Sequence, residues 1–319
     1  MTILKRIFII FLNSCYDTYA YLVHSGVISR SSEQKIEGKL IFYYHSIEKG
    51  LINDPIRYKF GTQKIRQLVN YLNLWTRRGY NTSNSQFVSA CSVLCSYFEL
   101  HDANTIDISD IISEEEYRKI KLFADGKSGG VIESDPSRFF SNTSAGFKEF
   151  SGSRHSVRHF NGEEIPVNLI IDVINIARNA PSVCNRQSAR VILVNNKKLL
   201  QEVLRIQGGL NASADTVSQL FVVTSVRGLF VSEGERNQMY TDGGIFLLNL
   251  LYSLHYHNIA ACPLHAAFDS GKEIRIKRML QISPEEKIIA FVAFGFPSDN
   301  FKVPFSRRKE ISEILRIIK

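Results

Sequence analysis

The sequence has few of the residues that cross-link a protein or bind a metal. Its 319 residues include five cysteines, an odd number, and no two of them form a CxxC pair. Cys91 and Cys95 lie four positions apart in an apolar stretch, which predicts structural thiols in a buried helix. His24, His45 and His101 lack the spacing of metal ligands. These absences argue against a disulfide framework and a metal site, and they favour a cytoplasmic location.

The sequence also lacks an apolar run long enough to cross a bilayer. The segment after Lys5 and Arg6 holds about six apolar residues, Ile7 to Leu12, which is shorter than the core of a signal peptide. No small-residue cleavage site follows it. We therefore expect a packed N-terminal helix here.

Acidic residues are scarce at the start of the chain. Residues 1–80 contain twelve Lys and Arg but five Asp and Glu, so most of the net charge of +8 lies there. A basic segment of this kind suits peripheral contact with an anionic membrane surface, and a solvated basic face is the common alternative. No module with stacking aromatic side chains is recognisable, so we predict no nucleic-acid partner.

The composition is that of a globular chain, with 44% hydrophobic and 22% charged residues, and the length allows two domains. Strand alternation is scarce in the first part, and Gly126 to Gly130 breaks the helical pattern. We predict a helical N-terminal extension at 1–130, a connector at 131–147 and a second domain at 148–319. The helices expected in the extension lie at 3–23, 33–48, 62–75, 86–99 and 114–124.

One run in the extension, Tyr43 to Leu51, gathers phenol, imidazole, carboxylate and ammonium groups. It has two interpretations. Either it is a substrate-binding element, or it is a helix end in which Glu48 and Lys49 are solvated and Gly50 is the C-cap.

A basic arm opens the second domain. Arg154, Ser156 and Arg158 place two guanidinium groups and a hydroxyl within five residues. Forked guanidinium hydrogen bonds suit a phosphate, and a solvated turn is the alternative. A helix with apolar residues at 169–177 follows and ends before Pro181.

The rest of the domain reads as buried helix and strand. Residues 190–194 predict a buried strand. Residues 288–294 are continuously apolar, as expected for a strand in a sheet that is covered on both faces. Residues 244–256 form a helix that is apolar on nearly every face, and such a helix is expected to be buried.

These features, taken in order, resemble the nitroreductase family of FMN-dependent oxidoreductases. The resemblance covers about 148–312. It rests on four pieces: an Arg-x-Ser-x-Arg arm, a Pro-Ser-x-x-Asn-x-Gln loop, a Pro-containing loop and a late basic run. In this chain they are Arg154, Ser156 and Arg158; Pro181, Ser182, Asn185 and Gln187; Pro263 and Leu264; and Ser306, Arg307 and Arg308.

The resemblance implies an α+β fold, with a mixed, mostly antiparallel sheet flanked by helices. It implies an enzyme that carries hydride from NAD(P)H through FMN to an oxidised small molecule in a ping-pong reaction. It also implies a homodimer with FMN at the interface. Because FMN carries the chemistry, no residue is predicted to be catalytic.

The same resemblance assigns residues to the cofactor. Arg154 and Arg307 would hold the phosphate, Ser156 the ribityl chain or phosphate, and Arg158 the ring near N1 and O2. His155 would contribute through its backbone. Asn211 is a candidate for the pyrimidine edge, and a turn is the alternative there. The residues expected near N5 are Leu264, His265 and Ala266. The residues expected from the second subunit are Pro181, Ser182, Val183 and Asn185.

The chain departs from the family pattern at two places. It has Gln187-Ser188-Ala189 where the family has Gln-Pro-Trp, and His265-Ala266 where Glu-Gly is frequent. His265 could meet a substrate or cap its loop, and Cys184 and Cys262 could be space-filling or redox-active. Residues 43–51 resemble a run in nitroreductase-like proteins of surface-polysaccharide synthesis. An alternative function is therefore a binding or scaffolding component of polysaccharide assembly.

Overall fold

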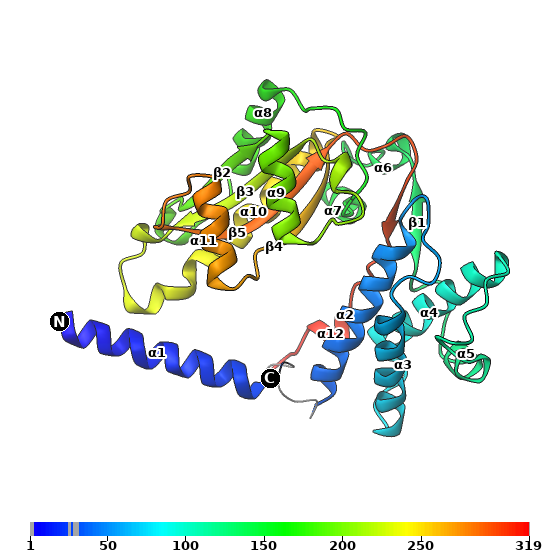
Figure 1. Ribbon diagram of the computed structural model, residues 1–319. Helices are drawn as coiled ribbons and strands as arrows, with labels where there is room; N and C mark the ends of the chain where they lie inside the picture. The colour runs from blue at the N-terminus through cyan, green and yellow to red at the C-terminus, as the bar shows by residue number, and fades with distance from the viewer. Residues whose placement is uncertain (1–2, 25–26, 28–31, 319) are drawn as a thin grey trace. The chain divides into compact units, whose positions relative to one another are not determined.

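The computed structural model describes residues 3–24, 27 and 32–318. The chain divides into two compact units: Met1–Ile132 with Pro304–Lys319, and Glu133–Val303 (Figure 1). The sequence predicted the last sixteen residues, 304–319, to belong to the second domain. In the structure they belong to the unit of the N-terminal helices, and Arg307 lies among them.

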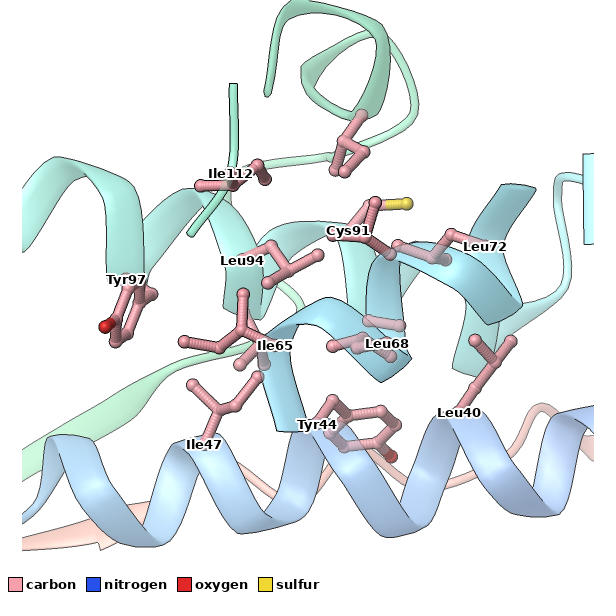
Figure 2. Packing of buried hydrophobic residues seen from close by; sticks show 14 of the residues in the cluster. Leu40, Tyr44, Ile47, Ile65, Leu68, Leu72, Cys91, Leu94, Tyr97 and Ile112 are labelled. Carbon is pink, nitrogen blue, oxygen red and sulfur yellow. The ribbon is translucent and has the colours of Figure 1, made fainter. Parts of the chain in front are cut away.

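The first unit is helical, as expected. Its core is formed by α2, α3 and α4, which meet through Leu40, Tyr44 and Ile47 on α2 and through facing residues of the other two helices (Figure 2). Trp75 lies fully buried in α3. The helices of this unit are α1 (Ile3–His24), α2 (Glu33–Leu51), α3 (Thr62–Arg77), α4 (Ser85–Ala103), α5 (Glu114–Lys121) and α12 (Ile311–Ile314).

The expected structural thiols are confirmed. Cys91 and Cys95 are both buried on α4, a helix with little polar surface, and no disulfide forms between them. Burial raises the pKa of the Cys95 thiol to about 11, so this thiol stays protonated at neutral pH.

The structure contradicts one of the two interpretations of the run at 43–51, namely the solvated helix end. Glu48 is only 1% exposed, so it is not solvated. Its carboxylate lies 3.2 Å from His45 Nδ1 and accepts from the backbone N–H of Ser306 at 3.5 Å. The C-cap of α2 is Ile52, and Gly50 is needed because a Cβ there would overlap the Phe60 ring. The run therefore holds the C-terminal segment against its own unit.

The second unit is an antiparallel sheet of four strands in the order β2-β3-β5-β4, which confirms the expected α+β class. Two further short strands, β1 and β6, pair with each other. The strands are β1 (Val131–Ser134), β2 (Ala189–Val194), β3 (Gln219–Val226), β4 (Ala260–His265), β5 (Glu286–Gly295) and β6 (Phe301–Pro304). The helices are α6 (Pro136–Phe139), α7 (Phe147–Ser153), α8 (Val167–Ala177), α9 (Lys197–Gln207), α10 (Gln238–Tyr256) and α11 (Ser270–Met279).

Helices cover both faces of this sheet. Phe221 and Phe294 stack at 4.1 Å and face the core that α8 and α10 build. Because side chains alternate along a strand, Leu220 and Val222 point to the opposite face, where α9 contacts β3. The continuously apolar β5 is buried on both sides, as predicted.

Helix α10 differs from the expectation of burial on nearly every face. Within one chain its outer side exposes Ile245 (39%), Leu248 (49%) and Tyr256 (56%). These residues are three, eight and eleven positions apart, which are close to whole helical turns, so they form one apolar stripe along the helix. The expected burial on nearly every face is therefore not met within one chain.

No helix in the described part of the chain is both long and apolar enough to span a bilayer.

Candidate functional site

The arm at 154–158 lies along the outer edge of β4. Ser156 pairs with Ala261 in a parallel bridge, and the N–H of Val157 donates to the Ala261 carbonyl at 3.1 Å. In an extended segment alternate side chains share a face. Val157 is fully buried, so Arg154, Ser156 and Arg158 occupy the other face together.

Arg158 is the most unusual charge in this arm. It is 8% exposed, and no carboxylate of the described residues forms an ion pair with it. Its Nη1 donates a long bond of 3.4 Å to the Ser156 carbonyl, while its buried Nε has no hydrogen-bond partner among the described residues. A buried, incompletely bonded guanidinium is costly, and an anionic ligand with acceptor oxygens would remove that cost. The donors present therefore fit a group such as FMN.

His255 of α10 supports the start of the arm, and sequence reasoning missed it. Ser153 donates to the Phe150 carbonyl at 2.9 Å and lies 2.9 Å from His255 Nε2, so the imidazole donates Nε2–H to the hydroxyl. Burial, with the nearby charges of Arg154 and His155, lowers the pKa of His255 to about 4. The ring is therefore neutral at pH 7 and fixes the end of α7. The sequence shows only a histidine in an apolar helix, so it carries no signal for this contact.

The end of β4 is held by a second missed residue, Gln207. Its Nε2 donates to the His265 carbonyl at 3.1 Å, and its Oε1 accepts from the Gly209 N–H at 2.6 Å. Gly208 between them has φ +78°, a conformation that favours glycine. The sequence signal for this contact is the Gly208-Gly209 pair after α9, because it marks a sharp turn whose backbone groups need hydrogen-bond partners.

His265 caps its own loop. The N–H of Ala267 donates to His265 Nδ1 at 3.2 Å, and the side chain is exposed. A neutral ring that accepts at Nδ1 carries its proton on Nε2. Leu264 and His265 pair with Phe291 and Ala290 of β5, so their backbone is fixed by the sheet.

Asn211 lies apart from the arm. It lines a surface cavity of about 500 Å³ between α9 and the turn at 214–216, together with Lys198 and Arg205. None of the residues 154–158 lines that cavity. The polar side chains around Asn211 are therefore not those of the arm.

The Pro181–Gln187 loop has an unusual backbone conformation. Cys184, Asn185 and Gln187 all have positive φ, near 50°, which costs energy for residues with a side chain. Asp242 stabilises the turn, because its buried carboxylate accepts from the Val183 N–H at 3.2 Å. Within the turn, Ser182 accepts from the Gln187 N–H at 2.9 Å.

An ion pair fixes the same loop to the segment before α10. Arg186 Nη1 lies 2.8 Å from Glu235 Oε2. The Glu235 carboxylate also accepts from the backbone N–H groups of Val231 and Ser232. Hydrogen bonds from Arg186 and Val231 lower the pKa of Glu235 to about 2, so the pair stays charged at neutral pH.

Within one chain, the Pro181–Gln187 loop and the arm at 154–158 lie at opposite edges of the sheet. The loop leads into β2 and the arm flanks β4, and these are the two outer strands of the sheet. Three strand spacings separate them by about 14 Å. The cavity beside Pro181, Ser182 and Asp242 has about 140 Å³, which is below the roughly 300–1,000 Å³ of typical ligand sites.

Arg307 belongs to the other unit. Its guanidinium lies 3.4 Å from Asp125 Oδ2 and 2.8 Å from Glu310 Oε1, and it contacts the Ser128 hydroxyl. Its charge is thus neutralised by two carboxylates of its own unit. The resemblance places Arg307 beside Arg154 at a phosphate, and this pairing argues against that role.

The comparisons with known proteins concern the second unit. Residues 152–296 match the model of the nitroreductase family. The chain contains a nitroreductase family domain. This nitroreductase domain holds the arm, the Pro181–Gln187 loop and the end of β4, but neither the helical extension nor Arg307.

Individual relatives cover about half of this chain. Iodotyrosine deiodinase of Hydra vulgaris is 23% identical over 194 residues, 51% of this chain and 69% of the relative. Iodotyrosine deiodinase of Danio rerio is 22% identical over 196 residues, 52% of this chain and 64% of the relative.

Solved structures also resemble the chain. A nitroreductase-like protein from Streptococcus mutans is 20% identical, covers 54% of this chain and 98% of its own, and has a TM-score of 0.47. An FMN-dependent nitroreductase from Clostridium difficile is 15% identical, covers 52% of this chain and 92% of its own, and has a TM-score of 0.42.

Proposed function

We propose that this protein is an FMN-dependent oxidoreductase that takes hydride from NAD(P)H and passes it to an oxidised small molecule. The observation that carries the proposal is the buried guanidinium of Arg158, which has an unsatisfied Nε on an arm shared with Arg154 and Ser156. The nitroreductase family match over the same residues supports this assignment.

The residues of the arm would bind and polarise the cofactor. Bound FMN supplies an acceptor and donor of hydride. Arg154 and Ser156 would take the phosphate and ribityl oxygens, since a cation and a hydroxyl on one face offer several donors. Arg158 would place its charge beside the ring, where it stabilises the negative charge of the reduced form.

The backbone at the end of β4 would line the space that the hydride donor and the hydride acceptor occupy one after the other. The backbone from Leu264 to Ala266 is fixed by β5 and by Gln207, so its polar groups need no reorganisation. His265 offers Nε2–H on the exposed side of this backbone segment. Donor and acceptor would occupy this space one after the other, which gives ping-pong kinetics.

We further propose that two copies complete the site. The Pro181–Asn185 turn lies at the opposite sheet edge from the arm, so a second copy must supply it to the same cofactor. The exposed stripe of Ile245, Leu248 and Tyr256 on α10 offers the apolar surface that such a homodimer would bury.

The dimer can be tested on α10. Leu248→Glu places a charge in the centre of the stripe, so we expect a monomer by sedimentation velocity and a loss of bound flavin. Lys197→Glu on the exposed start of α9 is the control and should keep both properties. A Leu248→Glu monomer that keeps its flavin would contradict the shared site.

The activity is tested on the purified full chain. We expect a yellow protein with bound FMN, identified by absorbance and mass spectrometry, that bleaches with NADH or NADPH and recovers when an acceptor is added. A colourless protein that ignores added FMN would overturn the enzyme assignment. It would favour the alternative of a binding component in polysaccharide assembly.

A second candidate activity is reductive removal of a halide from an aromatic amino acid. The matches to proteins named iodotyrosine deiodinase favour it. The departures at Ser188 and His265 from the usual nitroreductase pattern argue against a standard nitroaromatic substrate. Iodotyrosine and a nitroaromatic compound should be compared as acceptors for the reduced protein. Faster reoxidation by iodotyrosine, with iodide release, would select this activity.

A further inference from the structure

Helix α1 carries a broad apolar surface that the described part of the chain leaves open. Phe8 is 59% exposed, Phe11 61% and Leu4 79%. Twelve large apolar or aromatic side chains of this helix are 43% or more exposed. They are Ile3, Leu4, Ile7, Phe8, Ile10, Phe11, Leu12, Tyr16, Tyr19, Tyr21, Leu22 and Val23. A continuous surface of this kind marks an interaction site.

The helix has one narrow polar stripe. At 100° per residue, Arg6, Asn13, Asp17 and His24 fall on one side, because their spacings of seven, four and seven residues are close to whole turns. The stripe runs the length of α1. A helix that crossed a bilayer would bury it in hydrocarbon, whereas a helix that lies flat in the surface keeps it in water.

The breadth of the apolar face favours lipid over a second helix. A helical partner covers a narrow seam with a heptad-like spacing. The apolar side chains of α1 instead occupy most of the circumference, including Tyr16 and Val23 far from the centre of the face at Cys15. A surrounding apolar medium satisfies such a surface better than one partner does.

Charge and aromatic content identify the kind of lipid surface. Lys5 and Arg6 stand at one end of α1, and Asp17 is its single carboxylate. Tyr16, Tyr19 and Tyr21 gather toward the other end, and phenol rings prefer the boundary between hydrocarbon and water. We propose that α1 lies in the surface of a membrane containing anionic lipids, with Phe8, Phe11 and Leu22 buried among the acyl chains. This membrane contact is independent of the proposed flavin chemistry.

The test is co-sedimentation of the full chain with vesicles of phosphatidylcholine that contain about three in ten phosphatidylserine molecules. We expect binding that falls on the order of tenfold with pure phosphatidylcholine, and by a similar factor with Lys5→Gln combined with Arg6→Gln. Phe8→Gln combined with Phe11→Gln should weaken binding by more than tenfold. The matched control, Asn13→Gln with His24→Gln on the polar stripe, should bind like the parent.

A fluorescence experiment places the helix in the membrane. The chain has a single tryptophan, Trp75, which is fully buried and gives a constant background. Phe11→Trp should shift its emission to the blue when the anionic vesicles are added, while Asn13→Trp on the polar stripe should not.

Two results would overturn the proposal. One is a parent protein that stays in the supernatant with anionic vesicles. The other is an apolar-face double variant that binds vesicles like the parent but sediments as a smaller assembly, because α1 would then pack against a second copy.

Discussion

Two basic segments, the arm at 154–158 and the run at 306–308, look alike in the sequence but have opposite surroundings. Arg158 is buried, has no carboxylate partner among the described residues and keeps an unsatisfied Nε. Arg307 lies against Asp125 and Glu310, which neutralise it locally. An arginine is a candidate for an anionic ligand when its own fold leaves its charge uncompensated, and residue type alone does not reveal that.

The largest expected effect is a difference in flavin retention between a variant of the arm and a variant of the run at 306–308. Arg158→Ala should weaken FMN binding about 100-fold, because a buried, charge-assisted contact to an anionic ligand is lost. Arg307→Ala should change FMN binding less than threefold, because its charge is already paired. Flavin content after dialysis and titration of the stripped protein measure both constants. Equal losses in the two variants would remove the distinction.

A second prediction concerns pH and the support of the arm. The pKa of His255 is about 4 in the folded protein against 6.5 for the free side chain. Between these values the unfolded chain binds a proton that the folded one does not, so stability falls as pH drops from 6.5 toward 4. The loss should approach about 3 kcal/mol, and above pH 6.5 this contribution is fully present.

Chemical denaturation at pH 7.5 and pH 5 checks this effect. His255→Gln should flatten the dependence, while His24→Gln on the exposed α1 should leave it unchanged. An unaltered slope in His255→Gln would assign the pH dependence to other groups.

The smallest expected effect concerns the late segment. Arg307→Ala removes contacts with Asp125 and Glu310 on a largely accessible surface, so it should cost about 1 kcal/mol of stability. It should also make the 304–318 segment more sensitive to proteolysis. Arg308→Ala is the neighbouring control, because its guanidinium donates to the Ser306 carbonyl within the same segment. Identical cleavage in both variants would show that Arg307 does not hold this segment.

The sequence predicted what depends on local pattern. The apolar period at 169–177 correctly predicted a helix that ends before Pro181, and α8 ends at Ala177. The continuous run at 288–294 predicted a doubly covered strand, and β5 is one. The helical extension followed from such patterns, because periodicity and chain breakers act over a few residues. The fold class followed from the resemblance to a known family.

Contacts between distant segments escaped the sequence. Gln207 anchors His265, and Asp242 supports Val183, across 58 and 59 positions respectively. The local sequence allows Glu48 in solvent as readily as in the interior, and the contact with Ser306, 258 positions away, accompanies its burial. Nothing in the local sequence marks Asp242 or Glu48, and only the Gly208-Gly209 turn points to Gln207. Their partners are determined by the packing of whole elements.

The sequence by itself determined the elements, the sheet-forming strands and the residue types available to hold an anion. The tertiary structure decided which cations remain uncompensated, which apolar helix faces stay open, and which unit holds the C-terminal segment. The physical reason is that charge compensation and burial depend on neighbours in space. Arg158 and Arg307 differ only in those neighbours.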